Sequence, residues 1–116
     1  MAVSPEFRDY VLEMLEPLGG VTARRMFSGA GLYRHGTIFA LIAGDVLYFK
    51  VDEANRADYE AAGMGPFRPY PGKPFAMPYW EVPADVLEDR REACKWAAKA
   101  WEAGRRTGPA KTKRAR

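Results

Sequence analysis

Hydrophobic residues near the start of the chain recur at helical spacing. The repeating apolar positions are Phe7, Val11, Met14 and Leu18, separated by four, three and four residues. This spacing places them on one face of a helix. Ser4 is a suitable N-cap residue and Pro5 suits the first helical position, so we expect the helix to begin there and to end at Gly19.

From residue 21 onward the pattern changes to short apolar runs separated by turn residues. These runs are Val21 to Phe27, Leu32-Tyr33 with its neighbours, Thr37 to Ile42 and Val46 to Val51. Short turns at 34–36 and 43–45 predict antiparallel strands. The Ser-Gly-Ala-Gly segment at 28–31 lies inside an extended stretch, where glycine is typical of a bulge. We therefore expect one long first strand with a bend.

The second half of the chain predicts two more helices and two sheet edges. Asp52 can cap a short helix that ends at Gly63, and the last helix begins near Pro83 with acidic residues first and basic residues later, as the helix dipole favours. Between them, Phe67 to Tyr70 and Phe75 to Glu81 flank a proline-rich turn and fit edge strands. The expected order is helix, three strands, helix, two strands, helix (α-β-β-β-α-β-β-α).

Composition indicates one globular domain followed by a basic tail. The chain has 116 residues, of which 47% are hydrophobic, enough for a single two-layer core. Residues 1–103 hold 12 basic against 15 acidic residues, a formal charge of −3, whereas residues 104–116 hold six basic residues and no acidic one. Because the tail lacks large apolar side chains, we expect residues 104–116 to be disordered.

Targeting signals and disulfides are not expected. The sequence has no signal-peptide pattern and no apolar run long enough to cross a membrane, and Cys94 is its single cysteine. We therefore expect a cytoplasmic protein whose stability comes from burial.

Candidate catalytic and ligand-binding residues do not assemble into an active site. Residues 28–31 lack the Gly-Lys-Ser/Thr ending of a phosphate-binding loop. His35 fits a solvated turn and Cys94 a small buried hydrophobe. The carboxylates from Asp85 to Glu92 fit a helix start, and the acidic face of the first helix (Glu6, Asp9, Glu13, Glu16) fits either a solvated surface or a basic partner. We expect no enzyme activity, catalytic residue, cofactor or metal.

Alternating side chains point to an aromatic surface on the sheet. Leu47, Phe49 and Val51 should face the helices, which leaves Tyr48 and Lys50 on the open face. Tyr48 should then be exposed. The candidate partner-binding residues are Tyr33, Tyr48, Lys50 and Tyr79. Such a patch suits a protein partner or a homodimer, and the alternative is tyrosines packed at the sheet rim with hydrated hydroxyls.

Cations in the tail give a second candidate site. They are Arg105, Arg106, Lys111, Lys113, Arg114 and Arg116. They suit weak, sequence-independent contact with nucleic-acid phosphates, although a basic tail can also serve only solubility. Arg24 and Arg25 are adjacent in a strand, so their side chains should point to opposite faces and at most one can join a given patch.

Several segments together resemble the N-terminal domain of the TfoX/Sxy family over about residues 4–103. They are Arg25-Met26-Phe27, Gly29 to Tyr33, Phe39-Ala40-Leu41, Leu47 to Asp52, Tyr79 to Pro83 and Leu87-Glu88-Asp89. The resemblance implies an α+β domain, in which helices pack on one face of a five-stranded antiparallel sheet. It also implies a regulator of bacterial competence genes, a coactivator beside the cyclic-AMP receptor protein without catalytic residues. Longer members add a C-terminal domain, where this chain has its basic tail.

The sequence therefore predicts a non-enzymatic regulatory module that binds a protein partner, with a transcription regulator as the class of partner that the resemblance implies. The alternative is a nucleic-acid-binding protein that uses its basic tail.

Overall fold

Helix α1 (Pro5–Met14) begins where the sequence predicts, because Ser4 caps it. The Ser4 hydroxyl accepts a hydrogen bond from the Phe7 backbone N–H at 3.1 Å. The structure is a computed structural model that describes residues 4–26, 29–68, 72 and 77–107. The other helical segments are η1 (Glu16–Leu18), α2 (Arg56–Ala61), α3 (Ala84–Leu87) and α4 (Arg90–Thr107).

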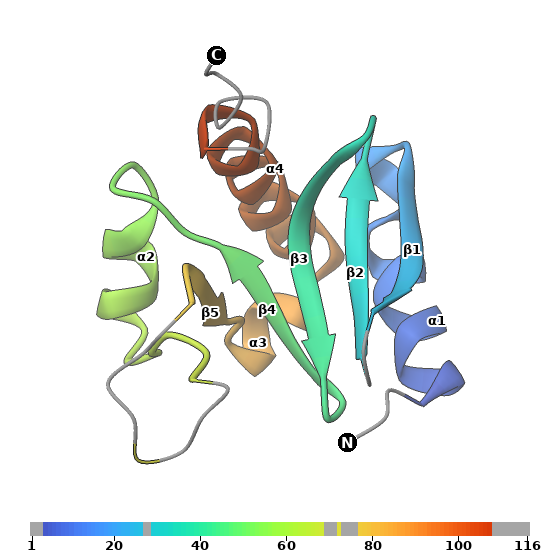
Figure 1. Cartoon of the computed structure of the whole chain (residues 1–116), viewed down its shortest axis with the longest axis horizontal. Coiled ribbons are helices and arrows are strands. Elements are labelled where there is room, and N and C mark those ends of the chain that lie inside the picture. Colours follow the sequence, from blue (N-terminus) through green and yellow to red (C-terminus); the bar gives the residue numbers. More distant parts are fainter. Residues whose placement is uncertain (1–3, 27–28, 69–71, 73–76, 108–116) are drawn as a thin grey trace.

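The strands form one antiparallel sheet in which neighbours in sequence are neighbours in space. They are β1 (Val21–Met26), β2 (Gly29–Arg34), β3 (Thr37–Ala43), β4 (Val46–Lys50) and β5 (Tyr79–Glu81), in the spatial order β1-β2-β3-β4-β5. Helices α1 and α4 lie behind the sheet in Figure 1. The predicted fold class, an α+β domain with a five-stranded antiparallel sheet, is confirmed.

The long bent strand expected from Val21 to Tyr33 is instead a hairpin. β1 and β2 pair with each other from Val21 opposite Arg34 to Met26 opposite Gly29, so four strands precede α2 and β5 follows it. The hairpin brings the Gly29 backbone so close to β3 that a Cβ there would collide with the Ile42 carbonyl oxygen. This close approach explains the glycine.

The bulge expected at residues 28–31 lies elsewhere, between β2 and β3. Leu32 is opposite Ala40 and Tyr33 is opposite Ile38, so Phe39 is the extra residue. Phe39 and Ala40 are both fully buried, which shows that the irregularity adds a second consecutive side chain to the core.

The core lies between the sheet and the helices. One row of side chains crosses the sheet on its helix-covered face: Ala23, Leu32, Ala40, Phe49 and Trp80. Helix α4 packs on β3 and β4, and contributes small buried residues, among them Ala93, Ala97 and Ala100. Tyr59 of α2 lies edge-on to Trp80 of β5 and Trp96 of α4, with ring centroids 6.2 and 4.8 Å away. Thus α2 reaches the same face.

The C-terminal helical segment begins next to Pro83 as predicted, but it is divided into α3 and α4 and it ends later than expected. The helix expected from Pro83 is divided, because the Asp89 carboxylate accepts hydrogen bonds from the N–H groups of Arg91 and Glu92 and so starts α4 anew. At its other end α4 continues to Thr107. Residues 104–107, expected to be disordered, are therefore its last turn, and residues 108–116 lie outside the described part of the chain.

The segment before β5 is only partly described. The Phe67 N–H donates to the Tyr79 carbonyl at 2.7 Å, and the Met77 N–H donates to the Phe67 carbonyl at 2.9 Å. These bonds place Phe67 beside the edge of the sheet. Pro69 and Tyr70 of the predicted edge strand lie outside the described residues. Most of the proline-rich turn lies outside the described residues.

Candidate partner-binding face of the sheet

The side of the sheet opposite the helices, called the open face here, combines aromatic rings with cations. A row of side chains crosses it through all five strands: Arg24, Gly31, Leu41, Tyr48 and Glu81. Thr22 and Tyr33, and Lys50 and Tyr79, form pairs in the next row. All four predicted residues, Tyr33, Tyr48, Lys50 and Tyr79, therefore share this face because strand side chains alternate.

Two cation–aromatic pairs organise this face. The Arg24 guanidinium lies 5.5 Å from the centre of the Tyr33 ring, and the Lys50 ammonium lies 5.1 Å from the centre of the Tyr79 ring. Burial lowers the pKa of Lys50, with the nearby Asp52 charge acting in the opposite direction. The contact with the Tyr79 ring partly replaces the water that Lys50 gives up on burial.

Tyr48, expected to be exposed, is half-buried. Phe67 from the segment before β5 packs on it, with ring centroids 4.6 Å apart. Burial raises the pKa of the Tyr48 hydroxyl, and the negative charge of Glu81 raises it further. Phe67 was not predicted as part of the site, because nothing in the local pattern shows that its segment folds back over β4.

Tyr79 is the most enclosed of the four candidates, with only 6% of its surface exposed. Burial, followed by the effect of a charged Tyr33, raises the pKa of Tyr79 to about 12. Tyr79 thus acts as the floor of the open face, while the half-buried Tyr33, Tyr48 and Lys50 are the parts that a partner can touch.

Because Gly31 has no side chain, the side chains of Met26, Tyr33 and Ile38 can lie over its backbone. A Cβ at this position would lie 3.0 Å from Ile38 Cδ1, 3.3 Å from Tyr33 Cε1 and 3.4 Å from Met26 Sδ. The three side chains therefore converge over the glycine backbone. Together with Leu41 and Phe67 they make the centre of the open face apolar, with Arg24, Lys50 and Glu81 around it.

The other residues considered as possible site residues lie where the sequence predicts a structural or solvent-exposed role. His35 is exposed in the β2–β3 turn, with its ring centroid 5.9 Å from that of Trp101. The Cys94 thiol donates a hydrogen bond to the Met14 carbonyl, and burial raises its pKa. The acidic residues of α1 are exposed; Asp9 lies 3.3 Å from Arg8, and Glu13 lies 3.6 Å from Arg90. Within the described residues, no group of three metal-ligating side chains is close enough to hold an ion.

The basic tail is described only at its start. Arg105 lies over the Trp101 ring, 4.9 Å from its centre, and Arg106 forms an ion pair with Asp52. These two cations are therefore tied to the domain. Lys111, Lys113, Arg114 and Arg116 lie outside the described residues. Across the described part of the chain, no helix is long and apolar enough to span a membrane.

Comparison with known proteins gives one family. No curated protein matches the chain. The family model for the TfoX N-terminal domain matches residues 13–104, which includes all five strands and most of the helical layer. This match covers most of the chain and confirms the resemblance seen in the sequence. The chain belongs to the TfoX N-terminal domain family.

Proposed function

We propose that this protein is a regulatory module that acts without catalysis, by binding a transcription regulator through the open face of its sheet. Membership of the TfoX N-terminal domain family supports a role in competence-related regulation. The single observation that carries the choice of surface is the row of aromatic and cationic residues on the face without helices. The main contacts on this face are between the rings of Tyr48 and Phe67 and between the Lys50 ammonium and the Tyr79 ring.

The composition of this face suits a protein partner. Aromatic residues and arginine are enriched in protein interfaces. An aromatic ring buries a large area with few rotatable bonds. Here the rings are held in place by neighbouring side chains, so little conformational entropy is lost when a partner covers them. Arg24 and Lys50 are cations and Glu81 is an anion, so the rim of the open face carries both signs of charge. Such a pattern fixes the orientation of a partner more than it raises affinity.

Affinity capture from an extract of the source organism tests this proposal. Lys50→Glu places a negative charge on the open face, beside Tyr79, and should abolish recovery of the partner. Lys99→Glu on α4, where Lys99 pairs with the exposed Asp58, is the matched control for charge reversal elsewhere and should retain the partner. If the wild type recovers no transcription regulator, or if both variants behave alike, the proposal fails.

Nucleic-acid binding by the tail is the second candidate. The observation in its favour is the excess of six basic residues and no acidic residue in positions 104–116. Titration of duplex DNA at two salt concentrations, with the intact chain and with a chain ending at Thr107, separates the candidates. Phosphate contacts predict binding that weakens steeply with salt and disappears with the truncation. Equal binding by both chains would exclude the tail.

A further inference from the structure

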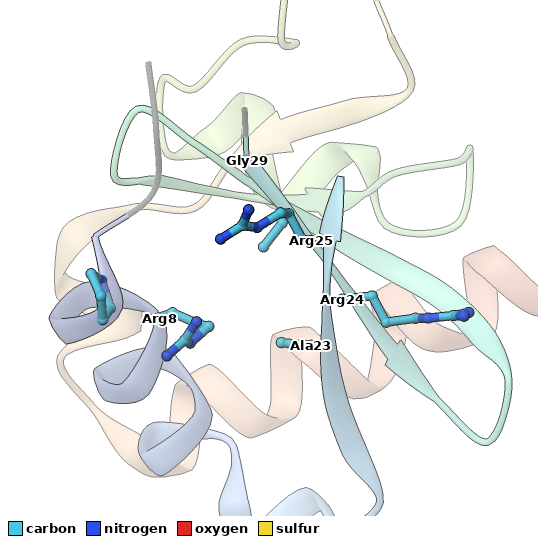
Figure 2. Close-up of a pocket in the computed structure, with 7 residues that line it drawn as sticks. Arg8, Ala23, Arg24, Arg25 and Gly29 are labelled. Carbon is cyan, nitrogen blue, oxygen red and sulfur yellow. The ribbon is translucent and has the colours of Figure 1, made fainter. Parts of the chain in front are cut away.

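A small pocket opens between α1 and the first hairpin, on the helix-covered side of the sheet. It has a volume of about 120 Å³ and is lined by Pro5 and Arg8 of α1, by Ala23, Arg24 and Arg25 of β1, and by Gly29 and Ala30 of β2. Figure 2 shows the Arg25 side chain extending from β1 toward α1, with Arg8 on the facing side of the helix. Neighbouring Arg24 points away, as strand alternation requires.

Arg25 occupies a position that the rest of its row uses for the core. Across the sheet, Arg25 is opposite Ala30, which is opposite Ile42, which is opposite Leu47. The last three are buried, whereas Arg25 is exposed at the end of the row. A cation at a strand position that faces the core is unusual unless an opposite charge or a ligand pairs with it.

The described residues supply no anion for Arg25. No carboxylate lines the pocket, and its lining residues carry positive charge only. Arg8 has one contact of this kind, from its Nε to the exposed Asp9 carboxylate at 3.3 Å, which leaves its Nη groups able to donate. The Arg25 side chain has no hydrogen bond or ion pair within the described ranges. Two guanidinium groups therefore face a space bounded by small residues and backbone.

We propose that this pocket binds a phosphate group, held between Arg8 and Arg25. Guanidinium groups bind phosphate through paired N–H donors, and two of them can neutralise a dianion. The volume admits one such group rather than a polymer. Because the Arg24 side chain points away from α1, the Arg8 and Arg25 guanidinium groups form a point site and not the continuous basic stripe expected for nucleic acid. The pocket is separate from the open face, so this proposal stands independently of the partner-binding role.

Assigned ¹⁵N NMR spectra recorded during titration with inorganic phosphate, at constant ionic strength, test the site. Saturable shifts should concentrate at the amides of Gly29, Ala30 and Arg25. Arg25→Gln and Arg8→Gln should each weaken binding about tenfold. Arg91→Gln, which removes an exposed cation of α4 outside the pocket lining, is the control and should leave binding unchanged. Amide spectra of each variant without phosphate verify that it remains folded.

A parallel titration with phenyl phosphate distinguishes the source of the phosphate. Equal or tighter binding indicates that the pocket takes a phosphate ester of a larger ligand, and weaker binding indicates free phosphate. The proposal is overturned if the shifts do not saturate, or if Arg91→Gln weakens binding as much as Arg25→Gln. Either result would mean general attraction to a basic surface.

Discussion

Arg106, in the last turn of α4, donates a hydrogen bond of 2.7 Å from Nε to Oδ2 of Asp52, just beyond β4. The other Asp52 oxygen accepts from the Ala54 N–H at 2.9 Å. The Arg106 hydrogen bond is the main reason that the pKa of Asp52 is below its ordinary value of 3.8. A residue expected to be in a disordered tail thus fixes the end of the helix to the sheet.

Replacing Arg106 with Gln should reduce stability at neutral pH and make it less sensitive to acid. A lowered pKa in the folded state contributes stability above the ordinary pKa, and this contribution is lost as pH falls through the lowered value. Because both groups are reached by solvent, we expect a loss of about 0.5 kcal/mol near neutral pH and almost none at about pH 2. Urea denaturation at both pH values measures this difference. An equal loss at both would contradict an electrostatic origin.

Gly104→Ala should destabilise the protein although alanine favours helices. A Cβ at residue 104 would lie 2.6 Å from the Ile38 carbonyl oxygen and 3.1 Å from Thr37 Cγ2, so α4 would have to move away from β3. This overpacking costs about 1–3 kcal/mol, more than the gain of about 1 kcal/mol in helix propensity. Gly65→Ala is the control, since its Cβ would meet nothing within 4 Å. A stabilising Gly104→Ala in urea denaturation would show that α4 does not sit against β3.

Residue types and alternation predicted much of the fold and the residues of the open face. The period of two along β4 separates Leu47 and Phe49 from Tyr48 and Lys50, and this division is present in the structure. The start of α1 was predicted because its cap is local: Ser4 bonds to Phe7, three residues later. Features determined by neighbours in sequence were therefore accessible.

Features determined by contacts between residues far apart in the sequence could not be predicted in this way. The chain reverses between Met26 and Gly29 to form a hairpin, which glycine spacing alone does not distinguish from a bulge. The last turn of α4 is ordered by Gly104 against Ile38 and by Arg106 bonded to Asp52, partners more than fifty residues away. Likewise, Arg25 was correctly separated from Arg24, but the pocket required the position of α1.

Burial of Tyr79 should make stability fall in alkaline solution. Its pKa is raised from 10.0 to about 12, so the neutral hydroxyl contributes stability in full below pH 10, and this contribution is lost as pH rises toward 12. The shift corresponds to about 2–3 kcal/mol. Tyr79→Phe, which cannot ionise, should show a shallower decline of unfolding free energy between these pH values. Tyr10→Phe, at an exposed position, is the control. Parallel pH profiles for wild type and Tyr79→Phe would contradict the assignment.

Trp101 should be needed to hold the β2–β3 turn against α4. Its Nε1 donates a hydrogen bond of 2.8 Å to the Arg34 carbonyl, and the Arg34 guanidinium lies 4.4 Å from the ring centre while bonding to the carbonyl of Gly19. Trp101→Phe keeps an aromatic ring but removes the Nε1 donor to the Arg34 carbonyl. We therefore expect the free energy of unfolding, measured by urea denaturation, to fall by about 1–3 kcal/mol. Hydrogen exchange should become faster at Gly36 and Thr37 and remain unchanged in α1. Uniformly faster exchange would show that Trp101 supports the whole core instead of this turn.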